Sequence, residues 1–230
     1  MLAEQHYPAT LAPDETHVWV ARISAFTRRE CELQGRLDAT EASRAKRFRF
    51  PRDRTNYIVA HGLLREILGR YVDADPSRLR FERGRYGKPS LRTPQLGPAL
   101  EFNLSHANDV MVLAVTRGRD VGIDVEYMSD LAFEEIVAEC FSARERTALA
   151  ALPIEDRRAG FFATWARKEA YAKALGFGIG EGFAACDVLD TRACERWQMR
   201  DVDVPAGYTA AVVGAVPAWC LQHVVLESAC

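Results

Sequence analysis

The sequence predicts an α+β fold built from two similar halves, each about 100 residues long. Strand-like and helix-like segments both recur along the 230 residues. Two helix starts with the same capping-box pattern, Asp38-Ala-Thr-Glu41 and Ser142-Ala-Arg-Glu145, begin 104 residues apart. Arg65-Glu66 lies 103 residues before Lys168-Glu169, which is nearly the same offset. Each of these pairs lies in a long helical segment that ends in Leu-Gly. These observations predict a duplicated unit, with a first half at 1–117 and a second at 118–230.

Composition narrows the class of protein. A hydrophobic content of 48% and a charged content of 27% are enough for a sizeable core and argue against global disorder. The net charge of −2 gives no bulk electrostatic case for nucleic acid. No secretory signal precedes residue 17, and no apolar run reaches the roughly 18–20 residues that cross a bilayer. Six cysteines without a C-x-x-C spacing are typical of reduced, cytoplasmic thiols.

In the first half, apolar runs bounded by turn residues predict strands, and 3.6-residue periodicity predicts helices. Pro51 and the following residues are expected to break two helical segments, and the Gly and Pro of 84–89 predict a turn. The expected elements are a strand at 18–23, helices at 39–50 and 55–71, a short strand at 78–82, and strands at 100–105 and 110–116.

The second half is expected to open with a tight turn at 117–120, because Arg-Gly-Arg-Asp separates two apolar runs. Helical periodicity follows, and alternating apolar runs return towards the C-terminus. The expected elements are a strand at 121–126, helices at 133–140, 143–152 and 159–175, and strands at 186–189, 208–216 and 219–227.

The most informative pattern combines acidic residues on a strand with a helix that carries a carboxylate and a lysine. Asp124 and Glu126 are two apart and share one face of a strand. Trp165, Glu169 and Lys173 are four apart and share one face of a helix. Taken singly, each could be a solvent-facing group. If the two elements pack together, three carboxylates and an ammonium converge, which predicts a Mg²⁺ site with a cation beside a phosphate leaving group.

A basic run lies at the end of the first predicted helix. It contains six cations, interleaved with Phe48 and Phe50: Arg44, Lys46, Arg47, Arg49, Arg52 and Arg54. A solvated basic helix is one interpretation, a phosphate-binding patch is another, and the aromatic residues could suggest nucleic acid. Because the whole chain is nearly neutral, we favour a small anionic ligand.

Asn103-Leu-Ser-His106 ends a strand and begins a loop. We do not interpret Ser105 and His106 as a nucleophile pair, because neighbouring strand residues face opposite sides and no G-x-S-x-G elbow exists in the chain. We expect both to donate hydrogen bonds to phosphate. The Gly176–Gly180 segment follows a helix, so a helix end and turn is the better interpretation than a phosphate loop.

Four motifs in order resemble those of the 4′-phosphopantetheinyl transferases of the Sfp-like kind. They are Tyr86-Gly-Lys-Pro89, Asn103-Leu-Ser-His106, Gly122-Ile-Asp-Val-Glu126 followed by Phe141-Ser, and Trp165-Ala-Arg-Lys-Glu169 with Lys173. The resemblance implies a pseudo-dimeric monomer with the active site between its halves. It also implies transfer of 4′-phosphopantetheine from coenzyme A to a serine of an acyl or peptidyl carrier protein, with release of 3′,5′-ADP.

The resemblance further implies residue roles. Asp124, Glu126 and Glu169 would hold Mg²⁺, and Lys173 would contact the diphosphate and assist its departure. Glu169 is also the candidate base for the carrier serine. The implied nucleotide-phosphate contacts are Lys88, Ser105, His106 and, for the 3′-phosphate, Arg44. One departure stands in the first half: Glu41 lies one turn before Arg44, where a second cation is expected.

Carrier proteins are usually acidic around their serine, so we expect a basic and apolar patch near the helices of the second half. The candidates are Arg144, Arg146, Arg157 and Arg158, for which solvated helix ends are the competing interpretation. Three other functions are compatible with parts of the pattern. They are a metal-independent acyltransferase that uses acyl-coenzyme A, an RNA-binding module built on 44–54, and a family member that binds carrier protein without catalysis.

Overall fold

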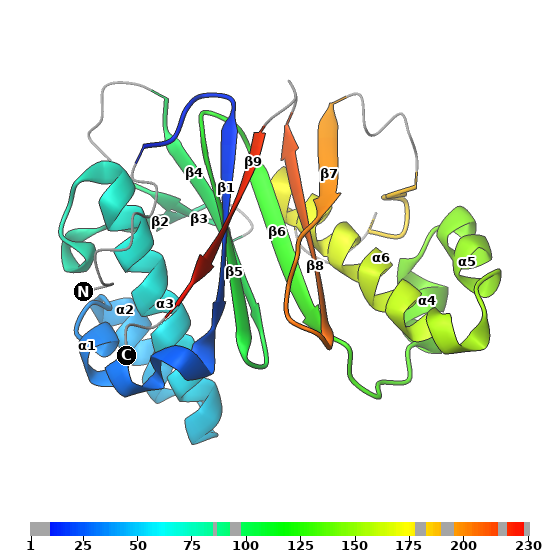
Figure 1. The fold of residues 1–230 in the computed structure, drawn as a ribbon, viewed down its shortest axis with the longest axis horizontal. Coiled ribbons are helices and arrows are strands. Elements are labelled where there is room, and N and C mark those ends of the chain that lie inside the picture. The colour runs from blue at the N-terminus through cyan, green and yellow to red at the C-terminus, as the bar shows by residue number, and fades with distance from the viewer. Residues whose placement is uncertain are drawn as a thin grey trace.

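The computed structural model describes residues 10–84, 87–92, 98–177, 183–189, 196–215 and 220–227. It confirms the α+β class and the two-half organisation. Figure 1 shows two sheets side by side in the middle of the molecule, with α1–α3 outside one sheet and α4–α6 outside the other. Among the described residues, no helix is both long and apolar enough to span a membrane.

The first half contains three eight-residue antiparallel strands, one long helix and several short elements. In chain order they are β1 (Glu15–Arg22), the 3₁₀ helix η1 (Ile23–Arg29), α1 (Glu30–Gln34), α2 (Ala39–Lys46), α3 (Pro51–Val72), the 3₁₀ helix η2 (Pro76–Arg78), β2 (Phe81–Arg83), β3 (Pro89–Leu91), β4 (Leu100–Ala107) and β5 (Val110–Arg117).

The second half repeats the plan of one strand, then helices, then a pair of strands. Its elements are β6 (Val121–Tyr127), α4 (Glu134–Cys140), α5 (Ala143–Ala150), α6 (Ile154–Leu175), β7 (Trp197–Asp201), β8 (Tyr208–Ala215) and β9 (Cys220–Leu226).

The sheet topology shows the duplication directly. The first sheet has the order β4-β5-β1-β9 and the second β6-β8-β7. In each half, the second strand of a hairpin lies between the first strand of that hairpin and the strand that begins the half. Thus β5 lies between β4 and β1, and β8 lies between β7 and β6. The additional strand β9 pairs in parallel with β1, so the end of the chain completes the sheet of the first half (Figure 1).

The repeated helix starts are structurally equivalent. Asp38 and Ser142 both form complete capping boxes, at the starts of α2 and α5. The glutamate of each box also binds a buried cation from the long helix that follows: Arg65 lies 2.6 Å from Glu41, and Lys168 lies 2.9 Å from Glu145. Both long helices have 22 residues. They differ at the end, because α3 continues three residues beyond Gly69 whereas α6 stops at Leu175.

Several expected boundaries were wrong. The predicted helix at 39–50 ends at Lys46, and Pro51 begins α3 where a break was expected. Proline is well suited to a first helical position, since its φ is already helical and its missing N–H has no partner there. The short elements η1, α1 and β3 were not predicted, because short segments carry too little periodic pattern.

The strand expected at 186–189 is also absent, and β7 was not predicted. The Cys186 carbonyl oxygen accepts a hydrogen bond from Lys168, and the Val188 N–H donates to Glu145. The buried ion pair thus satisfies backbone groups that a strand partner would otherwise bind.

Apolar clusters fill the spaces between the layers. One cluster packs α3 against the first sheet, around Trp19, Phe26 and Phe102. A second lies between the two sheets and contains Val18, Val112, Ile123 and Val212. Because β6 packs between α6 on one side and the first sheet on the other, side chains from both halves meet along it.

Gly122 lets α6 approach β6 closely. A Cβ atom at this position would overlap the Ala170 carbonyl oxygen and the Ala174 nitrogen and lie 3.0 Å from the Ala174 Cα atom. These are backbone atoms of a helix, so they can move only if α6 moves as a whole. Glycine is therefore required here for close packing.

We predict that Gly122→Ala lowers the free energy of unfolding by about 1–3 kcal/mol, the usual cost of overpacking. Urea unfolding followed by circular dichroism measures it. The matched control is Gly84→Ala, whose added Cβ meets only the Lys88 carbonyl oxygen at 3.5 Å. Equal stability of the two variants would contradict the packing role.

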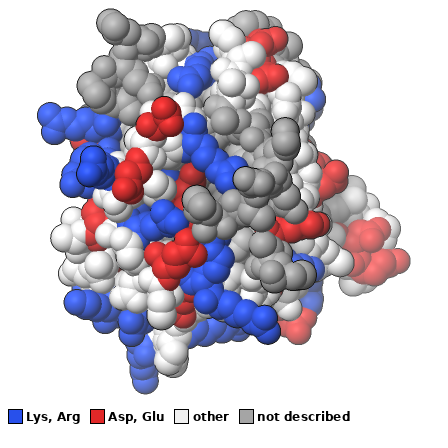
Figure 2. All heavy atoms as spheres, turned by 60° about the vertical axis from the view of Figure 1, so that its left-hand side comes forward, with Lys and Arg blue, Asp and Glu red and all other residues white. Residues whose placement is uncertain are grey.

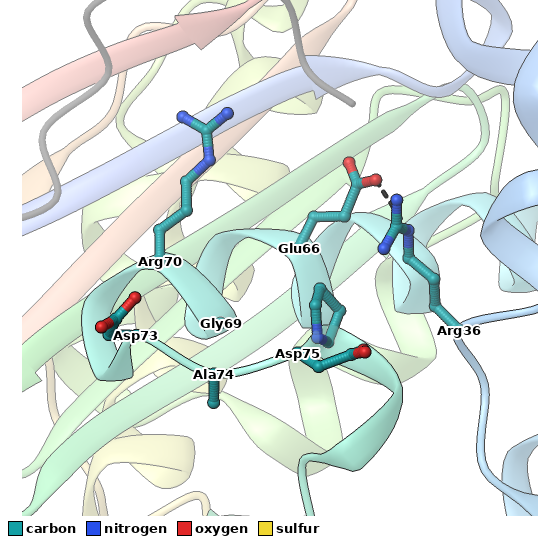
Figure 3. Close-up of a pocket in the computed structure, with 8 residues that line it drawn as sticks. Arg36, Glu66, Gly69, Arg70, Asp73, Ala74 and Asp75 are labelled. Carbon is teal, nitrogen blue, oxygen red and sulfur yellow. Dashed lines mark ion pairs between the residues drawn. The ribbon is translucent and has the colours of Figure 1, made fainter.

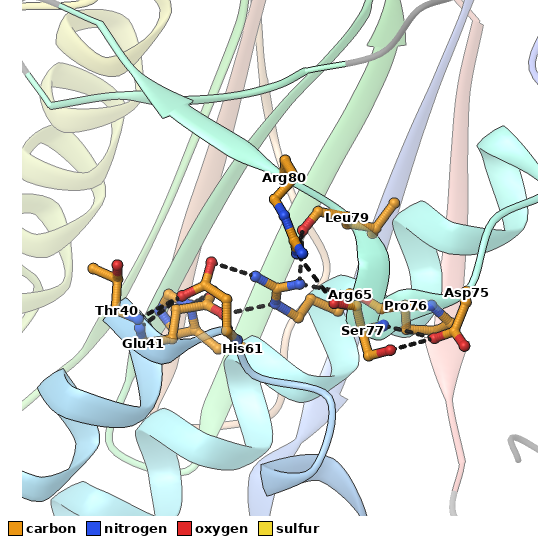
Figure 4. A network of polar contacts seen from close by, with 10 residues as sticks. Thr40, Glu41, His61, Arg65, Asp75, Pro76, Ser77, Leu79 and Arg80 are labelled. Atoms are coloured by element: carbon orange, nitrogen blue, oxygen red, sulfur yellow. Dashed lines mark hydrogen bonds and ion pairs between the residues drawn. The ribbon is translucent and has the colours of Figure 1, made fainter.

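A buried arginine organises the first half. Arg65 is fully buried, and its guanidinium donates to Asp38, Glu41 and the carbonyl oxygens of Pro76 and Leu79 (Figure 4). It thereby ties α3 to the start of α2 and to the η2 segment. Removing the cation leaves the Glu41 carboxylate buried with a weaker set of partners.

We predict that Arg65→Met destabilises the protein by about 3–5 kcal/mol, the usual cost of breaking one side of a buried ion pair. Arg80→Ala is the control, because Arg80 is exposed and, among the described residues, donates only to the Ser77 and Leu79 carbonyl oxygens. A loss of stability no larger than that of the control would show that Arg65 is dispensable.

Candidate functional site

The candidate site lies where β4 of the first half meets β6 of the second. Asn103 on β4 accepts a hydrogen bond from the Ile123 N–H at 2.8 Å. Two residues further along β4, the Ser105 hydroxyl donates to Asp124 at 2.8 Å. These contacts place residues of both halves side by side and fix the position of the Asp124 carboxylate.

Lys173 completes the cluster from α6. Its ammonium nitrogen lies 2.5 Å from Asp124 Oδ1, 3.2 Å from Ser105 Oγ and 3.9 Å from Glu169 Oε2. The helix and strand periods of the sequence predicted that Asp124, Glu169 and Lys173 could converge, and the structure brings them together with Ser105.

The carboxylates strongly affect one another. Burial, together with the negative charges of Asp124 and Glu169, raises the pKa of Glu126 to about 7. Lys173 and a hydrogen bond from Trp165 act in the opposite direction. Burial likewise raises the pKa of Glu169, with Lys173 lowering it and Asp124 raising it. The group therefore holds more negative charge than Lys173 alone neutralises.

The donor set fits a hard divalent cation. Asp124 is only 3% exposed, and its Oδ2 atom is buried without a hydrogen-bond partner in the part of the chain described. Within those same residues, no three or more His, Cys, Asp or Glu side chains already form a metal cage. Mg²⁺ needs no preformed cage, because waters and substrate phosphate oxygens usually complete its coordination shell.

The candidate phosphate-binding residues are more dispersed. The Lys88 ammonium donates to the Val121 carbonyl oxygen at 3.0 Å, at the start of β6, and burial lowers the pKa of Lys88. The Arg44 guanidinium lies 5.5 Å from the centre of the Tyr57 ring. Neither residue contacts Asp124. Tyr86 of the same motif as Lys88 lies outside the described residues, as do Gly178 to Gly180.

His61 was missed by sequence reasoning. Its ring stacks on Tyr57 with centroids 4.0 Å apart, and Nδ1 lies 3.1 Å from Glu41. Tyr57, His61 and Arg65 are spaced four apart on α3, which is the signal that they share a face. Glu41, where a second cation was expected, is instead the acceptor for His61 and Arg65.

His106 lies in a positively charged environment. Desolvation by the surrounding protein and the positive charges of His61, Lys173 and Arg44 together lower the pKa of His106 to about 4. The side chain keeps contact with solvent. It is therefore neutral at pH 7, with one ring nitrogen able to donate and the other able to accept.

We predict that His106 titrates well below its ordinary pKa of 6.5. The unfolded chain takes up this proton near pH 6.5 and the folded chain only near pH 4, so His106 lowers stability as the pH falls between these values. Histidine NMR signals measure the midpoint, with His106→Gln for assignment. Lys173→Met should raise the midpoint. A midpoint at or above 6.5 would contradict the argument.

A hollow of about 420 Å³ lies elsewhere, near the C-terminal end of α3 (Figure 3). Glu66 and Arg70 line it, and they stand 103 residues before Glu169 and Lys173. Here the glutamate is ion-paired to Arg29 and Arg36 at 2.6 and 2.8 Å. Strand β1 carries no carboxylate after Glu15, so only the second half has the acidic cluster.

The fold and the cluster define a class of protein in which two similar α+β halves meet at one polar cluster, to which the first half contributes Ser105. Comparison with known proteins agrees. The N-terminal domain model of the 4′-phosphopantetheinyl transferases matches residues 27–118, and the 4′-phosphopantetheinyl transferase superfamily model matches residues 120–212.

Individual relatives carry the same name. The chain is 33% identical to the 4′-phosphopantetheinyl transferase HetI of Nostoc sp. over 96% of this chain and 87% of that protein. It is 27% identical to Sfp of Bacillus subtilis, over 79% of this chain and 83% of Sfp. It is 38% identical to psf-1 of Bacillus pumilus, over 61% of this chain and 58% of psf-1. The chain belongs to the 4′-phosphopantetheinyl transferase family.

Proposed function

We propose that this protein transfers 4′-phosphopantetheine from coenzyme A to a serine of an acyl or peptidyl carrier protein and releases 3′,5′-ADP. The activity is that of a Mg²⁺-dependent holo-carrier-protein synthase. The observation that carries the proposal is the convergence of Asp124, Glu169 and Lys173 with Ser105 of the other half. Membership of the family supports the type of group transferred.

The chemistry required is attack of a hydroxyl on a phosphorus of the coenzyme A diphosphate. Such transfers depend mainly on positioning and on neutralising charge. Lys173 lies within the acidic cluster, with its ammonium 2.5 Å from Asp124 and 3.9 Å from Glu169. We propose that it offsets negative charge on the departing 3′,5′-ADP.

Asp124, Glu126 and Glu169 are the proposed ligands of Mg²⁺. Two observations support this assignment. The buried Oδ2 atom of Asp124 has no partner among the described residues, and the pKa values of Glu126 and Glu169 are raised. A nearby positive charge would interact with that oxygen and lower both pKa values. When bound, the ion would stabilise charge on the diphosphate oxygens.

Glu169 is also the proposed base for the carrier serine, directly or through water. A base needs to be ionised yet have a strong affinity for a proton. Burial raises the pKa of Glu169, which strengthens its affinity for a proton, and Lys173 at 3.9 Å favours its ionised form.

The nucleotide end of coenzyme A is proposed to lie towards the first half, where Arg44, Lys88, Ser105 and His106 would bind phosphates. Neutral His106 can donate one hydrogen bond, and Arg44 carries the positive charge for the 3′-phosphate. Glu41 takes no part, since its carboxylate is committed to Arg65 and His61.

One chain supplies both sides of this site, so we propose that it acts as a monomer, with halves bounded at 1–117 and 118–230. A cytoplasmic location stays a prediction from the sequence.

We predict that Asp124→Ala and Glu169→Gln each reduce transfer on the order of 100-fold or more, the loss typical of removing one charge-stabilising group. The assay is intact mass of an apo carrier protein incubated with the enzyme, coenzyme A and Mg²⁺. The expected product is heavier by one phosphopantetheine and does not form in EDTA.

Unfolding midpoints of both variants check that the fold persists, and Asp201→Ala serves as a control at an exposed carboxylate on β7 that pairs with Arg167. Retained transfer in both site variants would contradict the assignment. Transfer of an acyl group that survives EDTA would favour the metal-independent acyltransferase.

A further inference from the structure

The junction between α2 and α3 carries a basic surface that the nucleotide site does not use. We define this basic rim as Arg47, Arg49, Phe50, Arg52 and Arg54. All five side chains are exposed, and Phe50 is 58% exposed. In Figure 2, Lys and Arg side chains gather along the lower edge of this face, the end at which α3 begins in Figure 1.

No carboxylate among the described residues neutralises the charges of the basic rim. Arg52 donates to the side chain of Asn108, and the Arg49 guanidinium lies 5.3 Å from the Phe50 ring centre. Among the described residues, none of the four arginines is ion-paired with a carboxylate; the nearby acidic residue Asp53 is itself exposed. Four like charges within eight positions repel one another, and an acidic partner would relieve that repulsion.

The backbone adds to the positive potential. Phe50 is the N-cap of the 22-residue helix α3 and makes no side-chain capping hydrogen bond. The first N–H groups of α3 therefore lack a side-chain acceptor, and the positive end of the helix dipole lies at the basic rim. An exposed phenylalanine among arginines combines an apolar contact with charge, which is typical of a protein interface.

The basic rim is tied to the reacting centre. Arg52 and Asn56 both bind Asn108, at the turn between β4 and β5. Asn108 follows Ser105 by three residues, which is roughly 10 Å along a strand. A small protein that presents a serine to the Asp124 cluster would therefore extend over the basic rim.

Three of the four arginines expected to bind the carrier make contacts within the protein. Arg146 donates to the Ala138 and Phe141 carbonyl oxygens, and Arg157 donates to those of Ala150 and Leu152. Arg158 is paired with Asp130. Arg144 is the one of the four that makes no hydrogen bond or ion pair with the described residues, and its side chain is exposed.

We propose that the basic rim is the docking surface for an acidic face of the carrier protein, with Phe50 as its apolar contact. The inference rests on the proposed function, because it identifies where the macromolecular substrate of that reaction binds. Charge complementarity and position relative to Ser105 favour a carrier protein over RNA, the other partner that a basic surface could take.

The test is the double variant Arg49→Glu/Arg54→Glu, together with Phe50→Ser. Neither arginine makes a hydrogen bond or ion pair in the described chain, so the fold should persist. We expect the double variant to raise the KM for apo acyl carrier protein at least ~10-fold, because like charges then face each other. The kcat at saturating carrier and the KM for coenzyme A should stay within about twofold, since the rim lies outside the reacting centre.

The matched control is Arg78→Glu, a charge reversal at an exposed residue of η2, beyond the opposite end of α3, which should leave the carrier KM unchanged. Raising NaCl from about 50 to 300 mM should raise the carrier KM of the wild-type enzyme more than that of the double variant. Failure of the wild-type enzyme to modify any carrier would reject the proposed function itself.

Given wild-type transfer, three results would overturn the docking surface alone. The first is an unchanged carrier KM in the double variant. The second is a rise only in the KM for coenzyme A, which would make the rim part of the nucleotide site. The third is salt-dependent binding of a single-stranded RNA oligonucleotide that the double variant loses while its carrier KM is unchanged.

Discussion

The contact between α6 and β6 at Gly122 determines the rest of the site. Because no side chain separates them there, the backbone of α6 lies directly on the strand. Two residues further along β6, Asp124 comes within 2.5 Å of Lys173, and Glu169 lies one helical turn earlier on the same face. The acidic residues and Lys173 come close to one another only because the helix and the strand lie this close together.

The two similar halves share one structural plan, but the residues at equivalent positions have different surroundings. In both, a glutamate of a helix-capping box binds a buried cation of the long helix, which holds the short helix against the long one. In the second half, the next residue, Glu169, joins strand carboxylates. In the first half its counterpart Glu66 is neutralised by two arginines and lines the hollow near the end of α3. The first half supplies Ser105 and the basic surfaces instead.

The contacts of the arginines distinguish those that stabilise the fold from those that are proposed to bind a partner. Arg65, Arg146 and Arg157 bind backbone carbonyl oxygens at the ends or beginnings of elements, where they satisfy acceptors that have no helical partner. Within the part of the chain that the structure describes, the arginines of the basic rim bind neither backbone carbonyl oxygens nor carboxylates. A sequence shows both groups as positive charges near helices, and only their contacts distinguish them.

The sequence by itself determined the α+β class, the duplication, and which residues could form the acidic cluster, because helix and strand periods fix which side chains share a face. The ordered motifs also identified the family. The tertiary structure decided what local pattern cannot encode: the pairing of β9 with β1, the absence of a strand at 186–189, and the contact of Ser105 with Asp124. Each of these depends on a partner far away in the chain, such as the buried Lys168–Glu145 pair that binds the backbone at Cys186 and Val188.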